Sequence, residues 1–236
     1  MDIANSILSI TCLFLHLSSS NALESSVFGK VVRDKIVGGR VPIFGEYPFI
    51  VSIREKENGR RICGGSIVAP IFVMTACHCV CFEKEGETVA KSPETLVIIA
   101  GLQVFPDVGT AAEDSIFSQW RNVSDIFVHP GCKRSQDVFG WDGDFAVLTV
   151  STKLIFGEHI KPFKIFGLNK AALREGMDDV MDKGEECTLI GWGSSSIASN
   201  KYNADVLKAV QVTIIDYLKC QKELCSFQRM FCNFTH

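Results

Sequence analysis

The sequence predicts an all-β fold from an oxidising compartment; two observations point to the fold and a third to the compartment. Short runs rich in β-branched residues recur along the chain, and Gly or Pro residues bound them. Amphipathic helical periodicity is scarce. Ten cysteines in 236 residues are typical of a protein from an oxidising compartment, in which disulfides form. We therefore expect a sandwich or a barrel built from short strands.

The expected strands share β-branched composition and turn residues at their ends. They are Phe49–Ile53, Gly65–Ala69, Leu96–Ala100, Ile126–Val128, Phe145–Val150, Cys187–Ile190 and Ala209–Ile215. Three segments rich in charge, glycine and turn formers are expected to be loops, namely 82–95, 102–120 and 167–186. The best helix candidate is Asp216–Leu224, which follows the last strand.

Composition and charge exclude several classes of protein. The chain is 47% hydrophobic and 22% charged, which is ordinary for a globular protein and excludes disorder. The formal net charge is −3 and no basic block occurs, so we expect no nucleic-acid partner. No apolar run reaches the roughly 18 residues that a membrane-spanning helix needs.

The first residues are typical of a secretory signal peptide. An apolar run, Ile7–Leu17, is followed by Ser20-Asn21-Ala22, which places small residues at the −3 and −1 positions of a cleavage site. The residues before the run include Asp2 and no Lys or Arg, which departs from the usual pattern. A buried N-terminal helix is the alternative interpretation. We predict a signal peptide over 1–22 and hence an extracellular protein.

Ordered sequence blocks resemble one known family. They are Lys35-Ile36-Val37-Gly38-Gly39, Tyr47-Pro48-Phe49, Cys63-Gly64-Gly65-Ser66-Ile67, Thr75-Ala76-Cys77-His78-Cys79, Asp144-Phe145-Ala146-Val147-Leu148, Gly191-Trp192-Gly193 and Met230-Phe231-Cys232. In this order they resemble the chymotrypsin/trypsin-like serine proteases, whose catalytic triad combines a base, an orienting acid and a nucleophile for acyl transfer. The resemblance implies two six-stranded antiparallel β-barrels with the active site in the cleft between them, and a protein or peptide substrate.

The resemblance also implies a domain plan and two catalytic residues. A short propeptide, 23–35, would end at an activation cleavage between Lys35 and Ile36, and the protease domain would occupy 36–236. His78 would be the general base, since imidazole titrates near neutral pH. Asp144 would accept the other ring N–H and fix the tautomer. Taken singly, the two would be a hydrogen-bonded histidine and a turn aspartate, but the matching blocks favour the catalytic roles.

The family's nucleophile is missing from the sequence. It belongs to a Gly-Asp-Ser-Gly-Gly motif shortly after the position of Cys232, where this chain has only Asn233-Phe234-Thr235-His236. Neither Ser115 nor the serines at 194–196 lie in such a motif. We therefore expect the second barrel to be incomplete and the chain to be inactive as it stands, because loss of the nucleophile costs a related enzyme about 10⁶ in rate.

The cysteines carry a further set of expectations. The resemblance implies Cys63–Cys79 and Cys220–Cys232 bridges, and it places the partner of Cys187 beyond this chain. Four cysteines have no family counterpart: Cys77, Cys81, Cys132 and Cys225. The Cys77–Cys81 cluster invites a zinc interpretation, but its spacing suits a metal poorly, so we expect neither a metal nor a cofactor. Cys77 also occupies the position directly before His78, where the family usually has a small residue.

Two Asn-x-Ser/Thr sequences occur, at Asn122 and Asn233. We predict glycosylation at Asn122 if the residue is exposed, while Asn233 lies too near the end to be modified efficiently. Either could equally be an unmodified surface asparagine.

Three hypotheses for function follow. The chain could be a truncated product of a secreted trypsin-like serine endopeptidase, which is the one we favour. It could instead be a non-catalytic protease homologue that serves as an extracellular binding or regulatory module. The last is a disulfide-rich structural β protein with accidental motif matches, which the ordered blocks disfavour.

Overall fold

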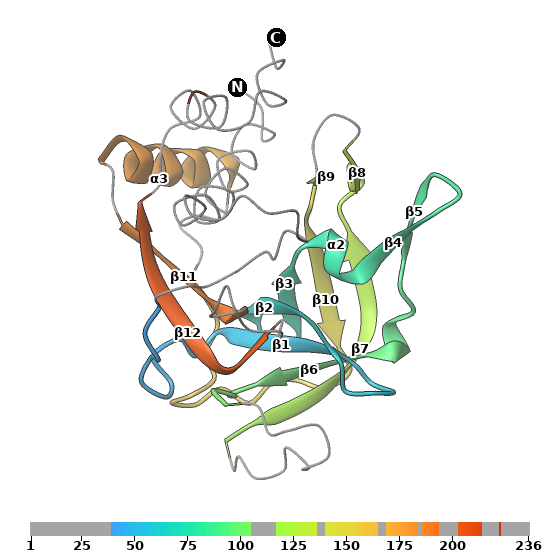
Figure 1. The fold of residues 1–236 in the computed structure, drawn as a ribbon, viewed down its shortest axis with the longest axis horizontal. Helices are drawn as coiled ribbons and strands as arrows, with labels where there is room; N and C mark the ends of the chain where they lie inside the picture. Colours follow the sequence, from blue (N-terminus) through green and yellow to red (C-terminus); the bar gives the residue numbers. More distant parts are fainter. Residues whose placement is uncertain are drawn as a thin grey trace, which may run out of the picture. The chain divides into compact units, whose positions relative to one another are not determined.

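The computed structural model describes residues 39–104, 117–135, 140–164, 169–183, 186–193 and 203–213, together with Lys222 (Figure 1). The chain divides into two compact units: Pro42–Ile165, and a second unit made of Met1–Val41 and Phe166–His236. Several predicted features lie outside the described residues. They are the signal peptide, the Lys35–Ile36 junction, Cys220, Cys225, Cys232 and, apart from Lys222, the helix candidate Asp216–Leu224.

The unit Pro42–Ile165 is built on a closed, six-stranded antiparallel barrel. Its strands are β1 (Ile50–Glu55), β2 (Arg61–Ala69), β3 (Phe72–Thr75), β6 (Leu96–Ala100), β7 (Gln119–Val128) and β10 (Ala146–Val150). Around the barrel the order is β1-β2-β3-β10-β7-β6, and β6 pairs with β1 to close it. The predicted all-β fold is confirmed.

Strand composition explains the barrel core. Every residue of β6 is buried, and β10 alternates buried and half-buried positions, as a strand with one face in a core should. The interior contains Val51, Ile53, Ile67, Ile98 and Leu148, each with no exposed surface. Burial of each such side chain contributes about 1.5–3 kcal/mol. Because a closed barrel has no free strand edge, the unit also protects its backbone groups.

The prediction of a loop over 82–95 is wrong. Strands β4 (Cys81–Lys84) and β5 (Glu87–Ala90) form an antiparallel hairpin, and a short 3₁₀ helix, η1 (Pro93–Thr95), follows. Glu85 and Gly86 connect the strands with φ values of 54° and 83°. Two successive residues with positive φ make the turn that suits the twist of a hairpin. The charged side chains along this hairpin obscured the strand pattern.

The predicted loop over 167–186 is also wrong, because helix α3 occupies Lys170–Lys183. The side chain of Asn169 accepts a hydrogen bond from the Ala172 N–H at 2.9 Å, which is how an asparagine caps a helix N-terminus. The segment mixes good helix formers with many charges, and the charges favoured the loop interpretation.

Two long antiparallel strands belong to the second unit. β11 (Glu186–Gly193) and β12 (Asn203–Thr213) pair with Cys187 opposite Val212. Arg40 and Ala209 exchange backbone hydrogen bonds of 2.9 Å, so the N-terminal segment adds a bridge to β12. The remaining pair of described strands, β8 (Lys133–Arg134) with β9 (Trp141–Asp142), belongs to the unit Pro42–Ile165. None of the helices described is long and apolar enough to cross a membrane.

Candidate active site

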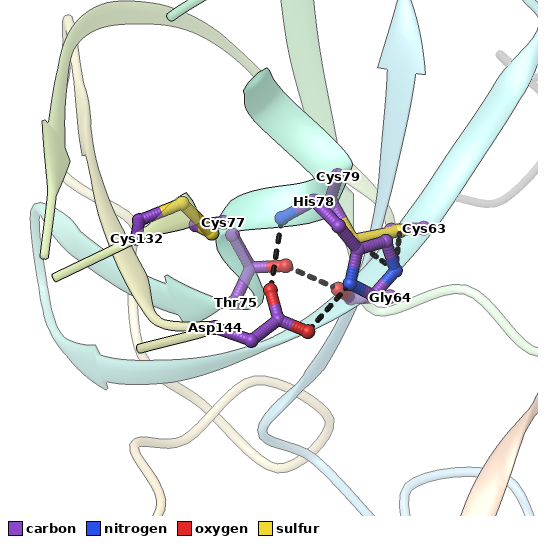
Figure 2. Close-up of polar contacts among 8 residues, drawn as sticks. All are labelled: Cys63, Gly64, Thr75, Cys77, His78, Cys79, Cys132 and Asp144. Atoms are coloured by element: carbon purple, nitrogen blue, oxygen red, sulfur yellow. Dashed lines mark hydrogen bonds and ion pairs between the residues drawn. A yellow bond between two sulfur atoms is a disulfide. The ribbon is translucent and has the colours of Figure 1, made fainter. Parts of the chain in front are cut away.

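The strand register brings His78 and Asp144 together. β3 ends at Thr75 and leads into α2 (Cys77–Val80), a single turn that contains His78. Asp144 lies just before β10, and in the barrel Thr75 is the register partner of Ala146. Residues that follow β3 therefore lie beside residues that precede β10. Figure 2 shows the two side chains facing each other across this edge.

The carboxylate of Asp144 makes two contacts with His78. Its Oδ2 lies 2.7 Å from the ring Nδ1, and its Oδ1 accepts the backbone N–H of His78 at 2.9 Å. The Asp144 side chain is 23% exposed, whereas the His78 side chain is 47% exposed. One carboxylate thus fixes both the ring and the peptide that carries it, while about half of the His78 side chain remains exposed.

The charge on Asp144 determines the histidine tautomer. Burial alone would raise the pKa of Asp144, but the hydrogen bonds from the ring and backbone of His78 outweigh burial and hold that pKa below its usual value. The carboxylate is therefore ionised at neutral pH and can only accept hydrogen bonds. It follows that Nδ1 of His78 carries the proton and donates it, which leaves the lone pair of neutral imidazole on Nε2.

The bridge that the resemblance assigns to Cys63 and Cys79 is present in the structure. The Cα atoms are 5.9 Å apart, and the bridge links β2 to α2. Nε2 of His78 lies 3.5 Å from the Cys79 sulfur and 4.0 Å from the Cys63 sulfur. Nearby, the Thr75 hydroxyl donates to the Gly64 carbonyl at 2.9 Å and joins the end of β3 to β2.

Cys63, His78 and Cys79 form the cluster of possible metal-ligating side chains that is found among the described residues. The ligand atoms of Cys63, His78 and Cys79 all lie within 4.8 Å of one another. The two sulfurs are bonded to each other, however, so neither is a thiolate ligand, and His78 is the one zinc ligand that the cluster still offers. This cluster therefore does not have the donor set of a zinc site.

A second bridge, Cys77–Cys132, was not predicted. Both residues were assigned no partner from the sequence, and the connectivity of ten cysteines cannot be deduced from spacing. The Cα atoms are 6.5 Å apart and the two residues are 55 positions apart in sequence. Cys77 is fully buried and Cys132 is 7% exposed, and both belong to the hydrophobic cluster that includes the barrel interior.

The remaining sequence candidates among the described residues take no part in the contact between His78 and Asp144. Cys81 is a buried free thiol, and burial followed by the charge of Asp144 raises its pKa. Cys187 lies in β11 of the other unit. His129 belongs to an exposed turn, where its Nδ1 accepts the Gly131 N–H at 3.1 Å. Asn122 is exposed on strand β7 rather than in a loop, so its side chain is accessible for modification.

Comparison with known proteins gives the family. The family model described as Trypsin matches residues 36–235. The chain belongs to the trypsin family. That match spans the region of the ordered blocks, and the closed six-stranded barrel agrees with the trypsin-like all-β fold.

The chain is also similar to two curated proteins. The chain is 28% identical over 190 residues to the venom peptide isomerase heavy chain of Agelenopsis aperta, covering 79% of this chain and 66% of the relative. It is 22% identical over 213 residues to ovochymase of Halocynthia roretzi, covering 90% of this chain and 12% of the relative. The chain therefore spans only part of the length of each relative.

Proposed function

We propose that this chain is a secreted trypsin-like serine endopeptidase family member in which His78 is the general base and Asp144 orients it. The observation that carries the proposal is the double contact of Asp144 with the ring and the backbone N–H of His78, at 2.7 and 2.9 Å. That contact selects the tautomer with a free lone pair on Nε2, which is the form that accepts a proton from a nucleophile.

The chemistry needs a serine hydroxyl next to Nε2. His78 would take the hydroxyl proton during attack on the peptide carbonyl and then return it to the departing amine. The Gly-Asp-Ser-Gly-Gly motif that provides this hydroxyl in the family does not occur in the 236 residues. We therefore propose that residues 1–236 alone provide base and orienter without a nucleophile, and do not hydrolyse peptide bonds.

Secretion and peptide substrates are part of the same proposal. The apolar run before Ala22 supports removal of residues 1–22, and the two bridges beside His78 are compatible with an oxidising compartment. Residues 23–35 would be a propeptide that ends at Lys35. The name of one relative, a venom peptide isomerase heavy chain, supports a peptide as the kind of substrate.

A non-catalytic homologue, acting as an extracellular binding or regulatory module, is the second candidate. The closed barrel of Pro42–Ile165 is compatible with it, since a binding module needs a stable fold but no nucleophile.

The test uses residues 1–236 secreted from cultured cells. Purified protein is cut with trypsin at Lys35 and assayed on peptide esters of Arg, Lys and aromatic residues, beside His78→Ala. We expect both proteins to give the blank rate. Hydrolysis by the unsubstituted chain that disappears in His78→Ala would contradict the proposed inactivity.

A second measurement separates the two candidates. A transcript that continues into a Gly-Asp-Ser-Gly-Gly segment, with activity restored in the longer protein, supports the endopeptidase. A secreted, cooperatively folded 1–236 monomer that binds a protein partner equally well with His78→Ala supports the module.

A further inference from the structure

Both sequence neighbours of His78 are disulfide-bonded, and the two bridges run in different directions. Cys79 is joined to Cys63 in β2, whereas Cys77 is joined to Cys132 in the turn after β7 (Figure 2). The peptide that carries the proposed base is thus covalently held on each side. The first bridge is implied by the family resemblance, and the second is the feature that needs an explanation.

The helix that carries His78 has little stability of its own. α2 spans only Cys77–Val80, and Ala76 at its N-cap makes no side-chain capping hydrogen bond. A single uncapped turn is costly to form and depends on tertiary contacts. The Cys77–Cys132 bridge is attached at the first residue of this turn, next to His78.

At its other end the bridge reaches the segment that holds Asp144. The Cys132 N–H donates to the His129 carbonyl at 2.8 Å, which closes the turn. The His129 N–H then donates to the Phe145 carbonyl at 3.0 Å. Phe145 is the residue after Asp144, so a hydrogen bond joins the turn with Cys132 to the segment with Asp144.

Van der Waals contact reinforces this link on the other side of Asp144. Gly143 has a φ of 54°, and a Cβ at that position would lie 2.7 Å from the carbonyl carbon and oxygen of Gly131. The Cys132 turn therefore lies directly against the residue before Asp144 and is hydrogen-bonded to the residue after it.

We propose that the Cys77–Cys132 disulfide is a positioning device for the His78–Asp144 pair. The bridge, the 129–132 turn, the Phe145 hydrogen bond and the Asp144–His78 contact form a closed ring of covalent and hydrogen bonds. Such a ring restricts how far α2 can shift relative to the carboxylate. The inference rests on the proposed roles of these two residues, and it matters because a misplacement of about 1 Å can cost a catalytic site 10²-fold in rate.

The buried thiol of Cys81 is poorly suited to attack the Cys77–Cys132 bridge by thiol–disulfide exchange. Burial and the charge of Asp144 raise the pKa of Cys81, and thiol–disulfide exchange needs the thiolate. Cys81 also belongs to the same hydrophobic cluster as Cys77 and Cys132. Cys81→Ala is therefore a matched control, because it removes a buried sulfur from this cluster without removing a bridge.

The experiment measures the ring of His78 directly. Protein comprising residues 1–236 and labelled with ¹⁵N-histidine is compared with a Cys77→Ala/Cys132→Ala double variant and with Cys81→Ala, well below each melting temperature. Ring ¹⁵N shifts report the tautomer, and a slowly exchanging downfield proton reports the Nδ1–H hydrogen bond. We expect a single Nδ1–H tautomer in the unsubstituted chain and in Cys81→Ala. In the double variant we expect mixed tautomers and loss of the downfield proton.

A bridge that only stabilised the fold would lower the melting temperature of the double variant but leave its His78 signals unchanged, and that result would overturn the inference. If the double variant does not fold, Cys77→Val/Cys132→Ala, which refills part of the lost volume, takes its place. Non-reducing peptide mapping that links Cys77 to another cysteine would also overturn it. An Nε2–H tautomer in the unsubstituted chain would overturn the proposed base role itself, so the two failures are distinguishable.

Discussion

Gly143 lies so close to Gly131 that a side chain on Gly143 would not fit. A Cβ at this position would lie 2.7 Å from the carbonyl carbon and oxygen of Gly131. It would also lie 2.8 Å from Nδ1 of His129. The φ of Gly143 is 54°, a conformation that also disfavours side chains. Asp144 is the next residue, so the contact has a direct effect on the candidate site.

We expect Gly143→Ala to destabilise the protein by roughly 1–3 kcal/mol beyond the cost of a left-handed alanine, because the added methyl overlaps the Gly131 backbone and forces it to move. Gly59→Ala is the matched control, since Gly59 has a φ of 66° and open space around it. Urea unfolding of both variants isolates the cost of the contact. If both variants lose the same unfolding free energy, the contact with Gly131 adds no cost of its own, and the prediction is wrong.

The two bridges should differ in their contribution to stability. A bridge stabilises the folded state by restricting the unfolded chain. The expected stabilisation is about 3 kcal/mol for Cys63–Cys79, which are 16 residues apart, and about 4 kcal/mol for Cys77–Cys132, which are 55 apart. The Cys63→Ala/Cys79→Ala and Cys77→Ala/Cys132→Ala variants can be compared by chemical unfolding. A larger loss from removing the shorter loop would contradict this order.

Acid should weaken the Asp144 contact in a definite direction. Because the folded pKa of Asp144 is lowered by its bonds with His78, its contribution is fully present above the unfolded pKa of about 3.9 and is lost as pH falls through the folded value. The difference in unfolding free energy between unsubstituted protein and Asp144→Asn should therefore shrink as pH is lowered below about 4. A difference that stays constant from neutral pH to about pH 2 would contradict this linkage.

Processing should occur at two positions without generating activity. Secreted material should begin after Ala22, and trypsin should then expose Ile36 as a new N-terminus. N-terminal sequencing checks both positions, and Met1 retained on secreted protein would contradict the signal peptide. Lys35→Gln is the control that should resist the second cleavage.

Cys187 distinguishes the two functional candidates. If the chain is a truncated protease, Cys187 in the secreted protein should not form one homogeneous bridge to another cysteine of the same chain. Some molecules should instead have Cys187 mispaired or linked to another molecule. Non-reducing peptide mapping checks this. A homogeneous bridge from Cys187 to Cys81 or Cys225, in a monomer that melts cooperatively, would favour the binding module.

Local sequence predicted the parts of the fold that are governed by apolar patterning. Leu96–Ala100 is an uninterrupted apolar run and forms a fully buried strand, and Ala146–Val150 follows the predicted strand to within one residue. The segment Lys170–Lys183 was missed because its charges resemble those of a loop, although Asn169 marks a helix start. The hairpin turn at Glu85-Gly86 was missed for the same reason.

The site was predicted less completely than the barrel. The motifs around His78 and Asp144 were sufficient to propose the pair, and the strand register explains their proximity. The partner of Cys77 was not predictable, because Cys132 lies 55 residues away and only the paired strands β3, β10 and β7 bring the two together. Pairing between distant cysteines is a property of the tertiary structure and has no local sequence signal.

The place of β10 in the barrel also sets an order of folding events. Although β10 is the last of the six strands in the chain, it is inserted between β3 and β7. The Cys63–Cys79 bridge can form once the first part of the unit has been synthesised. The contact between His78 and Asp144 can form only after a further 66 residues, because Asp144 lies that far along the chain. Contacts of such high sequence separation form late and slowly. The downfield proton of His78 would therefore serve as a kinetic probe of barrel closure, distinct from the earlier collapse of the β1–β3 region.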